Sequence, residues 1–365
     1  MEKINFPTKA QQLLDKRLKN NNLRSLPIFS PDNIDFFSND YLGIARELQK
    51  IQISHSHAGS TGSRLISGNS PYYEEVERYL ADFYKGEKAL LFNSGYNANL
   101  AVLSAIPQRG DFILYDELSH ASLRDGIRLS NAKSLKFKHN DISDLSKKIK
   151  KCTGEIFVVL ESVYSMDGDE ILREILELCH EKKCHIILDE AHGTGVLGAQ
   201  KKGIFEDFDK EILARVHTFG KALGTHGACV VGCKKLHQYL VNFARPFIYT
   251  TAMSEAQIEV IFLAHKILNK SDLAHKKLTQ NIAYFNEKIA KNNTQFLKSQ
   301  TPIQAYLNEQ NILKDKCEKL LQKNISVKSI LSPTVPISQE RIRITLHSFN
   351  TFSEIDELLE VILSP

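Results

Sequence analysis

Few cysteines and no long apolar run occur in this chain of 365 residues. Its six cysteines form no Cys-x-x-Cys pair, so neither a disulfide framework nor a structural zinc site is expected, and we take the thiols as reduced and mostly buried. No run approaches the roughly 20 apolar residues of a membrane span, and residues 1–14 hold no apolar signal-peptide core. We therefore expect a soluble, cytoplasmic protein that does not enter a membrane.

Charge of neither sign is concentrated along the sequence. The 47 Lys and Arg oppose 43 Asp and Glu, which gives a formal net charge of +4. The basic runs are short, as at 147–148 and 150–151, so a nucleic-acid surface is not expected. The length suffices for one large α/β domain with a smaller companion.

Short β-rich runs alternate with helical stretches from residue 89 onward. Strands separated by helices of about ten or more residues indicate βαβ units, so we expect an α/β fold with a mostly parallel central sheet. We divide the chain into an N-terminal arm and segment (1–50), a large α/β domain (51–250), and a linker helix with a small α+β domain (251–365). Residues 8–20 predict an amphipathic helix in the arm. The last part offers the helices NILKDKCEKLLQKN and SEIDELLEVIL and the strands SVKSI and RIRITL.

Ligands of open α/β sheets bind beyond the carboxyl ends of the strands. The residues that follow the predicted strands are rich in polar groups: Asn93 to Gly95, Asp116 to His120, Glu161 to Ser165, Asp189 to His192, and Thr218 to Lys221.

The stretch HIILDEAHGTGVLG (185–198) has several interpretations. As the DEAH box of a helicase it would need an upstream phosphate loop, but the one Gly-Lys pair, Gly220-Lys221, lies downstream. As a dinucleotide fingerprint its glycines should open the first turn after a strand, whereas DEAH intervenes. Asp189 and His192, with His120 or His217, could bind a metal, but no HExxH or paired Cys/His spacing supports one. A histidine that bridges a loop is the plain structural alternative.

Lys221 lies in the glycine-rich stretch VHTFGKALGTHGACVVG (216–232) and not on a charged helix face. Close backbone packing there would desolvate its amine and lower its pKa toward that of a nucleophile, although most lysines are surface residues. Thr218 adds a hydroxyl that could bind phosphate.

Three further segments suit a cofactor that bonds a lysine. The turn Ser94-Gly95-Tyr96 opens a helix whose free N–H groups could hold a phosphate. His120 precedes a helix and could stack on a planar ring. Asp189 could pair with a protonated pyridine nitrogen, as pyridoxal phosphate requires. A simple strand-to-helix turn would explain the first segment, and a helix cap or a core histidine would explain His120, but the three segments together fit one cofactor.

From residue 36 to the end, the sequence resembles the α-oxoamine synthase family of fold-type-I pyridoxal-phosphate enzymes. The motifs that carry the resemblance are FFSNDYLG, GSTGSRLISGN, LLFNSGYNANL, DELSHASL, ESVYSMDGD, LDEAHGTGVLG, HTFGKALGTHGA, FIYTTAMS, SPTVP and RIRITL. The segment between Arg24 and Asn39 is shorter than the family pattern. The resemblance implies a homodimer with active sites at the subunit interface.

The resemblance also implies residue roles. Lys221 would bond the cofactor and take the Cα proton, Asp189 would hold the pyridinium nitrogen, His192 the ring hydroxyl, and His120 would stack on the ring. The phosphate would be bound at Ser94, Gly95, Tyr96 and Thr218, joined by Thr250 or Thr251 of the partner subunit, and Ser165 would contact the cofactor. Asn39 and Arg343 would hold the amino-acid carboxylate, and His120, Thr334 and Arg24 would contact substrate.

The reaction implied is the decarboxylative condensation of L-alanine with a pimeloyl thioester of coenzyme A or an acyl-carrier protein. Relatives that condense glycine or serine are the alternative. An oxidoreductase that uses the GxGxxG stretch for NAD is a distant one.

Overall fold

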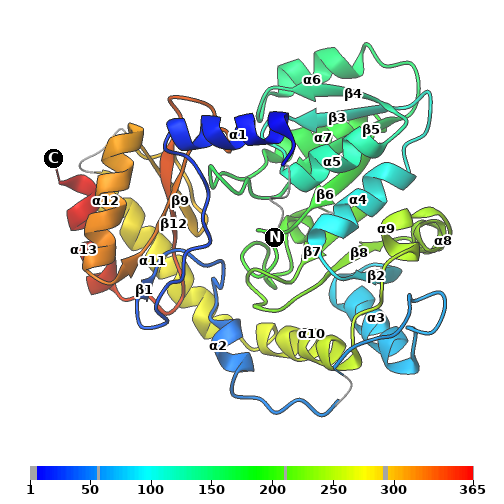
Figure 1. The fold of residues 1–365 in the computed structure, drawn as a ribbon. Helices are drawn as coiled ribbons and strands as arrows, with labels where there is room; N and C mark the ends of the chain where they lie inside the picture. Colours follow the sequence, from blue (N-terminus) through cyan, green and yellow to red (C-terminus); the bar gives the residue numbers. More distant parts are fainter. Residues whose placement is uncertain (1–5, 56–57, 209–211, 291–294, 365) are drawn as a thin grey trace.

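A seven-stranded sheet forms the centre of the computed structural model, which describes residues 6–55, 58–208, 212–290 and 295–364 (Figure 1). Its strand order is β2-β8-β7-β6-β5-β3-β4, and β8 alone pairs antiparallel with its neighbours. This confirms the expected mostly parallel sheet. The strands are β2 (Lys88–Phe92), β3 (Phe112–Asp116), β4 (Lys133–Phe137), β5 (Ile156–Glu161), β6 (His185–Asp189), β7 (Ala214–Thr218) and β8 (Ala228–Gly232).

Helices cover both faces of this sheet. Because side chains alternate along a strand, Phe157 and Val159 of β5 join one apolar cluster while Val158 and Leu160 join another. The first cluster takes in α4 (Gly95–Ala105), α5 (Ala121–Leu129), α8 (Lys234–Phe243) and α9 (Arg245–Ile248). The opposite face is covered by α6 (Ile142–Ile149) and α7 (Arg173–Glu181), and by α3 (Pro71–Phe83) and α10 (Glu255–Leu268). A short 3-10 helix, η1 (Ile204–Asp207), precedes β7.

A smaller unit follows the long helix α11 (Asp272–Ala290), on the other side of the molecule in Figure 1. Its antiparallel sheet has the order β11-β12-β9. The elements are β9 (Ile303–Leu307), α12 (Gln310–Gln322), β11 (Lys328–Ile330), β12 (Arg341–Thr345) and α13 (Phe352–Leu363). The predicted strand SVKSI is divided, because Ser326 ends β10 (Ile325–Ser326), which pairs in parallel with β1 (Ile34–Asp35). Part of the predicted N-terminal segment thus lies against the C-terminal elements, and the domain boundaries stay a prediction.

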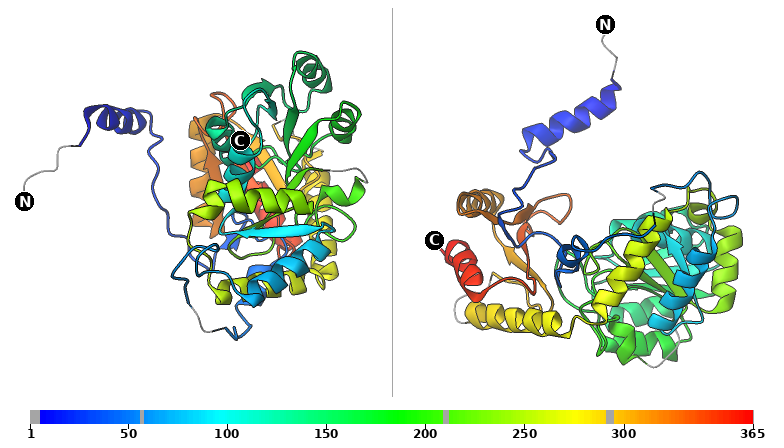
Figure 2. Two further views of the ribbon diagram at one scale, coloured as in Figure 1. Left: turned by 90° about the vertical axis from the view of Figure 1, so that its right-hand side faces the viewer. Right: turned by 90° about the horizontal axis from the view of Figure 1, so that it is seen from below.

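The N-terminal helix α1 (Thr8–Lys19) confirms the predicted arm helix and stands away from the body of the molecule (Figure 2). None of its residues is buried, and Leu13 and Leu18 are 67% and 63% exposed. The chain then reaches the short helix α2 (Ile44–Leu48), which packs beside α10. No helix in the described residues is both long and apolar enough to cross a membrane.

Candidate active site

Two neighbouring cavities, of about 70 and 400 Å³, meet at the carboxyl ends of β6 and β7. Both are lined by Gly95, Thr218 and Lys221. The smaller one is also lined by His120, Asp189 and His192, so four strand ends and the start of α4 converge on one space. Sequence reasoning predicted this convergence from the parallel sheet.

Lys221 lies in the connection between β7 and β8, which is closed by main-chain hydrogen bonds. Phe219 N–H donates to the Gly227 carbonyl at 2.9 Å, and Gly224 N–H donates to the Lys221 carbonyl at 2.8 Å. Gly224 has a φ of +61°, and a Cβ there would lie 2.5 Å from the backbone nitrogen of Ala45, so the turn packs tightly on α2. Burial lowers the pKa of the Lys221 amine, although the carboxylates of Asp189 and Glu161 oppose that shift.

The Asp189 carboxylate is held at the end of β6 by two donors. Its Oδ1 accepts from the Ala191 N–H at 2.8 Å, and its Oδ2 accepts from the Asn99 side-chain amide at 2.7 Å. Asp189 also lines the cavity with Lys221. A carboxylate fixed in this way can present negative charge to a cationic ring nitrogen.

His192 begins a chain of polar contacts toward the small sheet. The Tyr41 hydroxyl and His192 Nδ1 are 2.6 Å apart, and the same hydroxyl donates to Asn39 Oδ1 at 3.3 Å. Arg343, from β12, donates to Asn39 Oδ1 at 2.9 Å. Burial, with the positive charges of Lys221 and Arg343, holds the pKa of His192 well below its usual value, so its imidazole is neutral. The structure thus brings Asn39 and Arg343 together beside the cavity, and Tyr41, which sequence reasoning missed, connects them to His192.

His120 is the N-cap residue of α5. Its Nδ1 accepts from the Ser122 N–H at 3.2 Å, and its own N–H donates to Glu161 Oε1 at 2.6 Å. Burial lowers the pKa of His120, and the adjacent Lys221 acts in the same direction while Asp189 opposes it. Burial and the Asp189 charge raise the pKa of Glu161 well above its usual value.

The first turn of α4 offers main-chain amides to the cavity. The Ser94 hydroxyl accepts from the Asn97 N–H at 3.2 Å and thereby caps the helix. A Cβ on Gly95 would lie 2.1 Å from Thr218 Oγ1, so only glycine lets the helix start approach this hydroxyl. The Tyr96 side chain hydrogen-bonds to Asp125 and is partly exposed. The arrangement can bind an anion at a helix N-terminus.

The other predicted residues have the following positions. The Ser165 carbonyl accepts from Arg343 Nε at 2.7 Å. Thr250 accepts from Asn93 at 3.2 Å, and Thr251 pairs with Ser63 in a β-bridge. Arg24 and Thr334 hydrogen-bond to each other at 2.9 Å on the surface, and neither lines the two cavities. The structure therefore joins Arg24 and Thr334 to each other but not to Lys221.

The glycines of the GxGxxG stretch provide space for packing. A Cβ on Gly193 would lie 2.2 Å from Glu190 Oε2, and one on Gly195 would lie 2.4 Å from the Cβ of Ala222. Glu190 is buried and accepts from the N–H groups of Ile204 and Phe205. Close packing therefore explains why glycine occurs at these positions, and no bound dinucleotide is needed to explain the motif. In the described part of the chain, no group of three or more His, Cys, Asp or Glu side chains could hold a metal ion.

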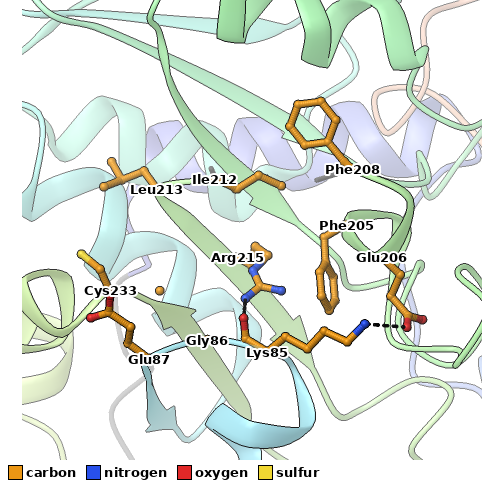
Figure 3. A pocket seen from close by; sticks show the side chains of 11 residues that line it. Lys85, Gly86, Glu87, Phe205, Glu206, Phe208, Ile212, Leu213, Arg215 and Cys233 are labelled. Carbon is orange, nitrogen blue, oxygen red and sulfur yellow. Dashed lines mark hydrogen bonds and ion pairs between the residues drawn. The ribbon is translucent and has the colours of Figure 1, made fainter. Parts of the chain in front are cut away.

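A larger cavity, of about 620 Å³, lies at the opposite end of β7 (Figure 3). Arg215 stacks on Phe205 there, 3.9 Å from the ring centroid, and donates to the Tyr84 carbonyl at 2.8 Å. Lys85 and Glu206, which both line it, form an ion pair at 4.0 Å (Figure 3). The Arg215 guanidinium is hydrogen-bonded to the main chain, and the lysine of this cavity, Lys85, has a largely exposed side chain, unlike Lys221.

A family model described as aminotransferase class I and II matches residues 31–362. The chain is 38% identical to an 8-amino-7-oxononanoate synthase of Emericella nidulans, over 93% of this chain and 90% of that protein. The solved 8-amino-7-oxononanoate synthase of Francisella tularensis is 32% identical with a TM-score of 0.74, covering 91% of this chain and 97% of its own. A serine palmitoyltransferase of Sphingomonas wittichii has a TM-score of 0.88 over 98% and 97% of the two chains, but at 24% identity this likeness shows the fold alone.

The helicase and NAD interpretations are therefore wrong, and the fold-type-I expectation is confirmed. The chain belongs to the aminotransferase class I and II family and, within it, to the α-oxoamine synthases, which are pyridoxal-phosphate-dependent acyltransferases.

Proposed function

We propose that this enzyme condenses L-alanine with a pimeloyl thioester to give 8-amino-7-oxononanoate, CO2 and the free thiol, a step of biotin synthesis. Relatives at 36 to 38% identity are 8-amino-7-oxononanoate synthases or putative ones, which supports this product. The observation that carries the proposal is the buried amine of Lys221 in one cavity with Asp189, His120 and His192.

The residues of the cavity fit pyridoxal phosphate. The amides of Gly95 and Tyr96 and the Thr218 hydroxyl would hold its phosphate, because the missing Cβ of Gly95 lets all three face one space. At the other end, Asp189 would hold the pyridine nitrogen, His192 the ring hydroxyl and His120 the ring face. When bound, the cofactor supplies an electron sink for the pair released as Cα loses its proton.

The chain's own residues then bind alanine and move its proton. The guanidinium of Arg343, supported by Asn39, would pair with the alanine carboxylate. Lys221 Nζ, whose pKa is lowered by burial, would take the Cα proton and later return one. The new carbon–carbon bond forms to the acyl carbon, the thiol leaves with a proton, and the former alanine carboxyl departs as CO2.

The second candidate is an α-oxoamine synthase that condenses glycine with a short acyl group or serine with a long one. The serine palmitoyltransferase likeness concerns the fold alone, whereas the named relatives at 38% identity favour alanine. The acyl carrier is coenzyme A or an acyl-carrier protein.

We further propose that the enzyme is a homodimer whose sites are shared between subunits. The exposed leucines of α1 support this proposal, because an apolar helix surface that the described part of its own chain does not bury is suited to cover a second copy. Thr250 or Thr251 of one subunit would then reach the phosphate in the other. Light scattering on purified protein measures the mass directly, and a monomer at micromolar concentration would contradict the proposal.

The deciding experiment for the reaction is an absorption titration with pyridoxal phosphate, followed by L-alanine, glycine and L-serine in separate samples. Borohydride reduction and peptide mapping should place the cofactor on Lys221, and Lys221→Ala should carry no label and show no turnover. Alanine with pimeloyl thioester should release the most thiol and CO2. A colourless protein without label would reject the cofactor, and faster turnover of glycine or serine would reject the substrate.

A further inference from the structure

A continuous line of buried side chains connects Asp189 with His120. The Asn99 side-chain nitrogen donates to Asp189 Oδ2 at 2.7 Å and also to Ser122 Oγ at 3.0 Å. Ser122 Oγ in turn lies 2.8 Å from His120 Nδ1. Asn99 and Ser122 are 2% and 1% exposed, so these contacts are shielded from bulk solvent.

The geometry determines which ring nitrogen of His120 carries the proton. The main-chain N–H of Ser122 can only donate, and it points at Nδ1. The Ser122 hydroxyl already accepts from Asn99, so its own hydrogen is free for Nδ1 as well. Nδ1 is therefore an acceptor, and the neutral ring carries its proton on Nε2.

The surroundings of His120 agree with a neutral ring. The ring caps the N-terminus of α5, where the helix dipole disfavours positive charge. Burial and the positive charges of Lys221 and Arg124 act in the same direction, whereas Asp189 and Asp125 oppose them. Glu161 accepts a hydrogen bond from the His120 backbone N–H, and burial raises the pKa of its carboxyl well above the usual value.

We infer that Asn99 and Ser122 are positioning residues, which keep His120 as the neutral Nε2–H tautomer and hold it in fixed relation to Asp189. Protonation of Nδ1 would break the helix cap, so His120 enters the reaction as a hydrogen-bond donor through Nε2 and not as a base through Nδ1. The role in catalysis rests on the proposed function, since His120 and Asp189 act there on the same cofactor.

Nuclear magnetic resonance of protein carrying nitrogen-labelled histidine tests the inference without any cofactor. His120→Gln assigns the signals, and wild-type His120 should show an unprotonated Nδ1 and a protonated Nε2 between about pH 6 and 8. In Ser122→Ala, the pH of half-protonation should rise by about half to one unit, because one hydrogen bond to the neutral ring is lost. Asn99→Leu should shift it in the same direction, because Asp189 then loses a donor and its less compensated negative charge favours the protonated His120 ring. Ser104→Ala, which removes a hydroxyl that donates to the Leu100 carbonyl within α4, is the matched control.

A protonated Nδ1 in the wild type would overturn the inference, as would a titration of Ser122→Ala and Asn99→Leu that matches Ser104→Ala. In the loaded enzyme, both variants should lower kcat by roughly two- to tenfold with little change in the KM for alanine. Failure of borohydride to label Lys221 would reject the proposed function instead, and it would leave the tautomer measurement unaffected.

Discussion

Replacing Gly195 with alanine should loosen the turn that carries Lys221. Gly195 has a φ of +83°, and its added Cβ would lie 2.4 Å from the Cβ of Ala222, the residue after Lys221. Carbon atoms prefer separations of about 3.5 to 4.0 Å, so the two loops must part by roughly 1 Å or more. The displacement would move the backbone that positions the Lys221 side chain.

The cost of Gly195→Ala has two parts. The left-handed backbone costs an alanine about 1 to 2 kcal/mol, and overpacking of a buried contact adds about 1 to 3 kcal/mol. Gly110→Ala is the matched control, because Gly110 also has a positive φ, +104°, but nothing lies within 4 Å of its Cβ position. The two variants should therefore differ by the overpacking cost of about 1 to 3 kcal/mol.

Urea denaturation at one protein concentration measures this difference, and a cofactor titration measures its effect on the site. Gly195→Ala should unfold at lower urea than Gly110→Ala and should bind pyridoxal phosphate about fivefold more weakly or worse, since 1 kcal/mol corresponds to that factor. Equal midpoints for the two variants, or an unchanged cofactor affinity in Gly195→Ala, would refute the packing argument for this motif.

Three further predictions concern charge. Asp189→Asn should keep the fold but lower turnover by more than about tenfold. The amide offers one oxygen to two buried donors, which costs about 1 to 3 kcal/mol, and it has no negative charge to pair with the ring nitrogen. Near-normal turnover with an unchanged circular dichroism spectrum would contradict this prediction. Arg343→Ala should raise the KM for alanine by about tenfold or more, the value of a charged hydrogen bond, and an unchanged KM would reject its role. Burial raises the pKa of Glu190 to about 7, so its contribution to stability is fully present below the ordinary value of 4.5 and is lost as the pH rises through about 7. When the pH is raised from about 5 to about 8, the wild type should therefore lose more stability than Glu190→Gln, and denaturation midpoints at both pH values would show the difference. An equal fall of the midpoint in both proteins would exclude Glu190 as a source of the pH dependence.

Local pattern was sufficient for the central sheet and for the position of Lys221. The strands alternate with helices along the chain, so their order in sequence predicts a parallel sheet whose carboxyl ends share one edge. Lys221, which lies in a glycine-rich turn after one of these strands, was therefore a candidate for the active site before any contact was known. The strand β9 was missed, because IQAYL at 303–307 is short and is defined by pairing with β12, about forty residues later.

The residues that the sequence did not reveal act through partners from other elements. Asn99 looks like an ordinary polar residue of a helix, and its importance arises only because Asp189 and Ser122 come to lie on either side of it. Tyr41 belonged to a motif that was noticed, but its contact with His192 spans 151 positions of sequence. Arg24 and Thr334 were predicted to contact substrate, and no pattern in the sequence indicated that they would hydrogen-bond to each other at the surface.

The reversed direction of β8 has a consequence for how the enzyme matures. Because β7 and β8 are antiparallel neighbours, the loop that carries Lys221 is a hairpin that can close from contacts within residues 214–232. Asp189, His120 and Gly95 reach the same place only after several helical crossovers have assembled the rest of the sheet. A nascent chain could thus shape its reactive loop early and still be unable to retain a cofactor. Capture of the cofactor would then mark the completion of folding, so its colour could be used to follow refolding.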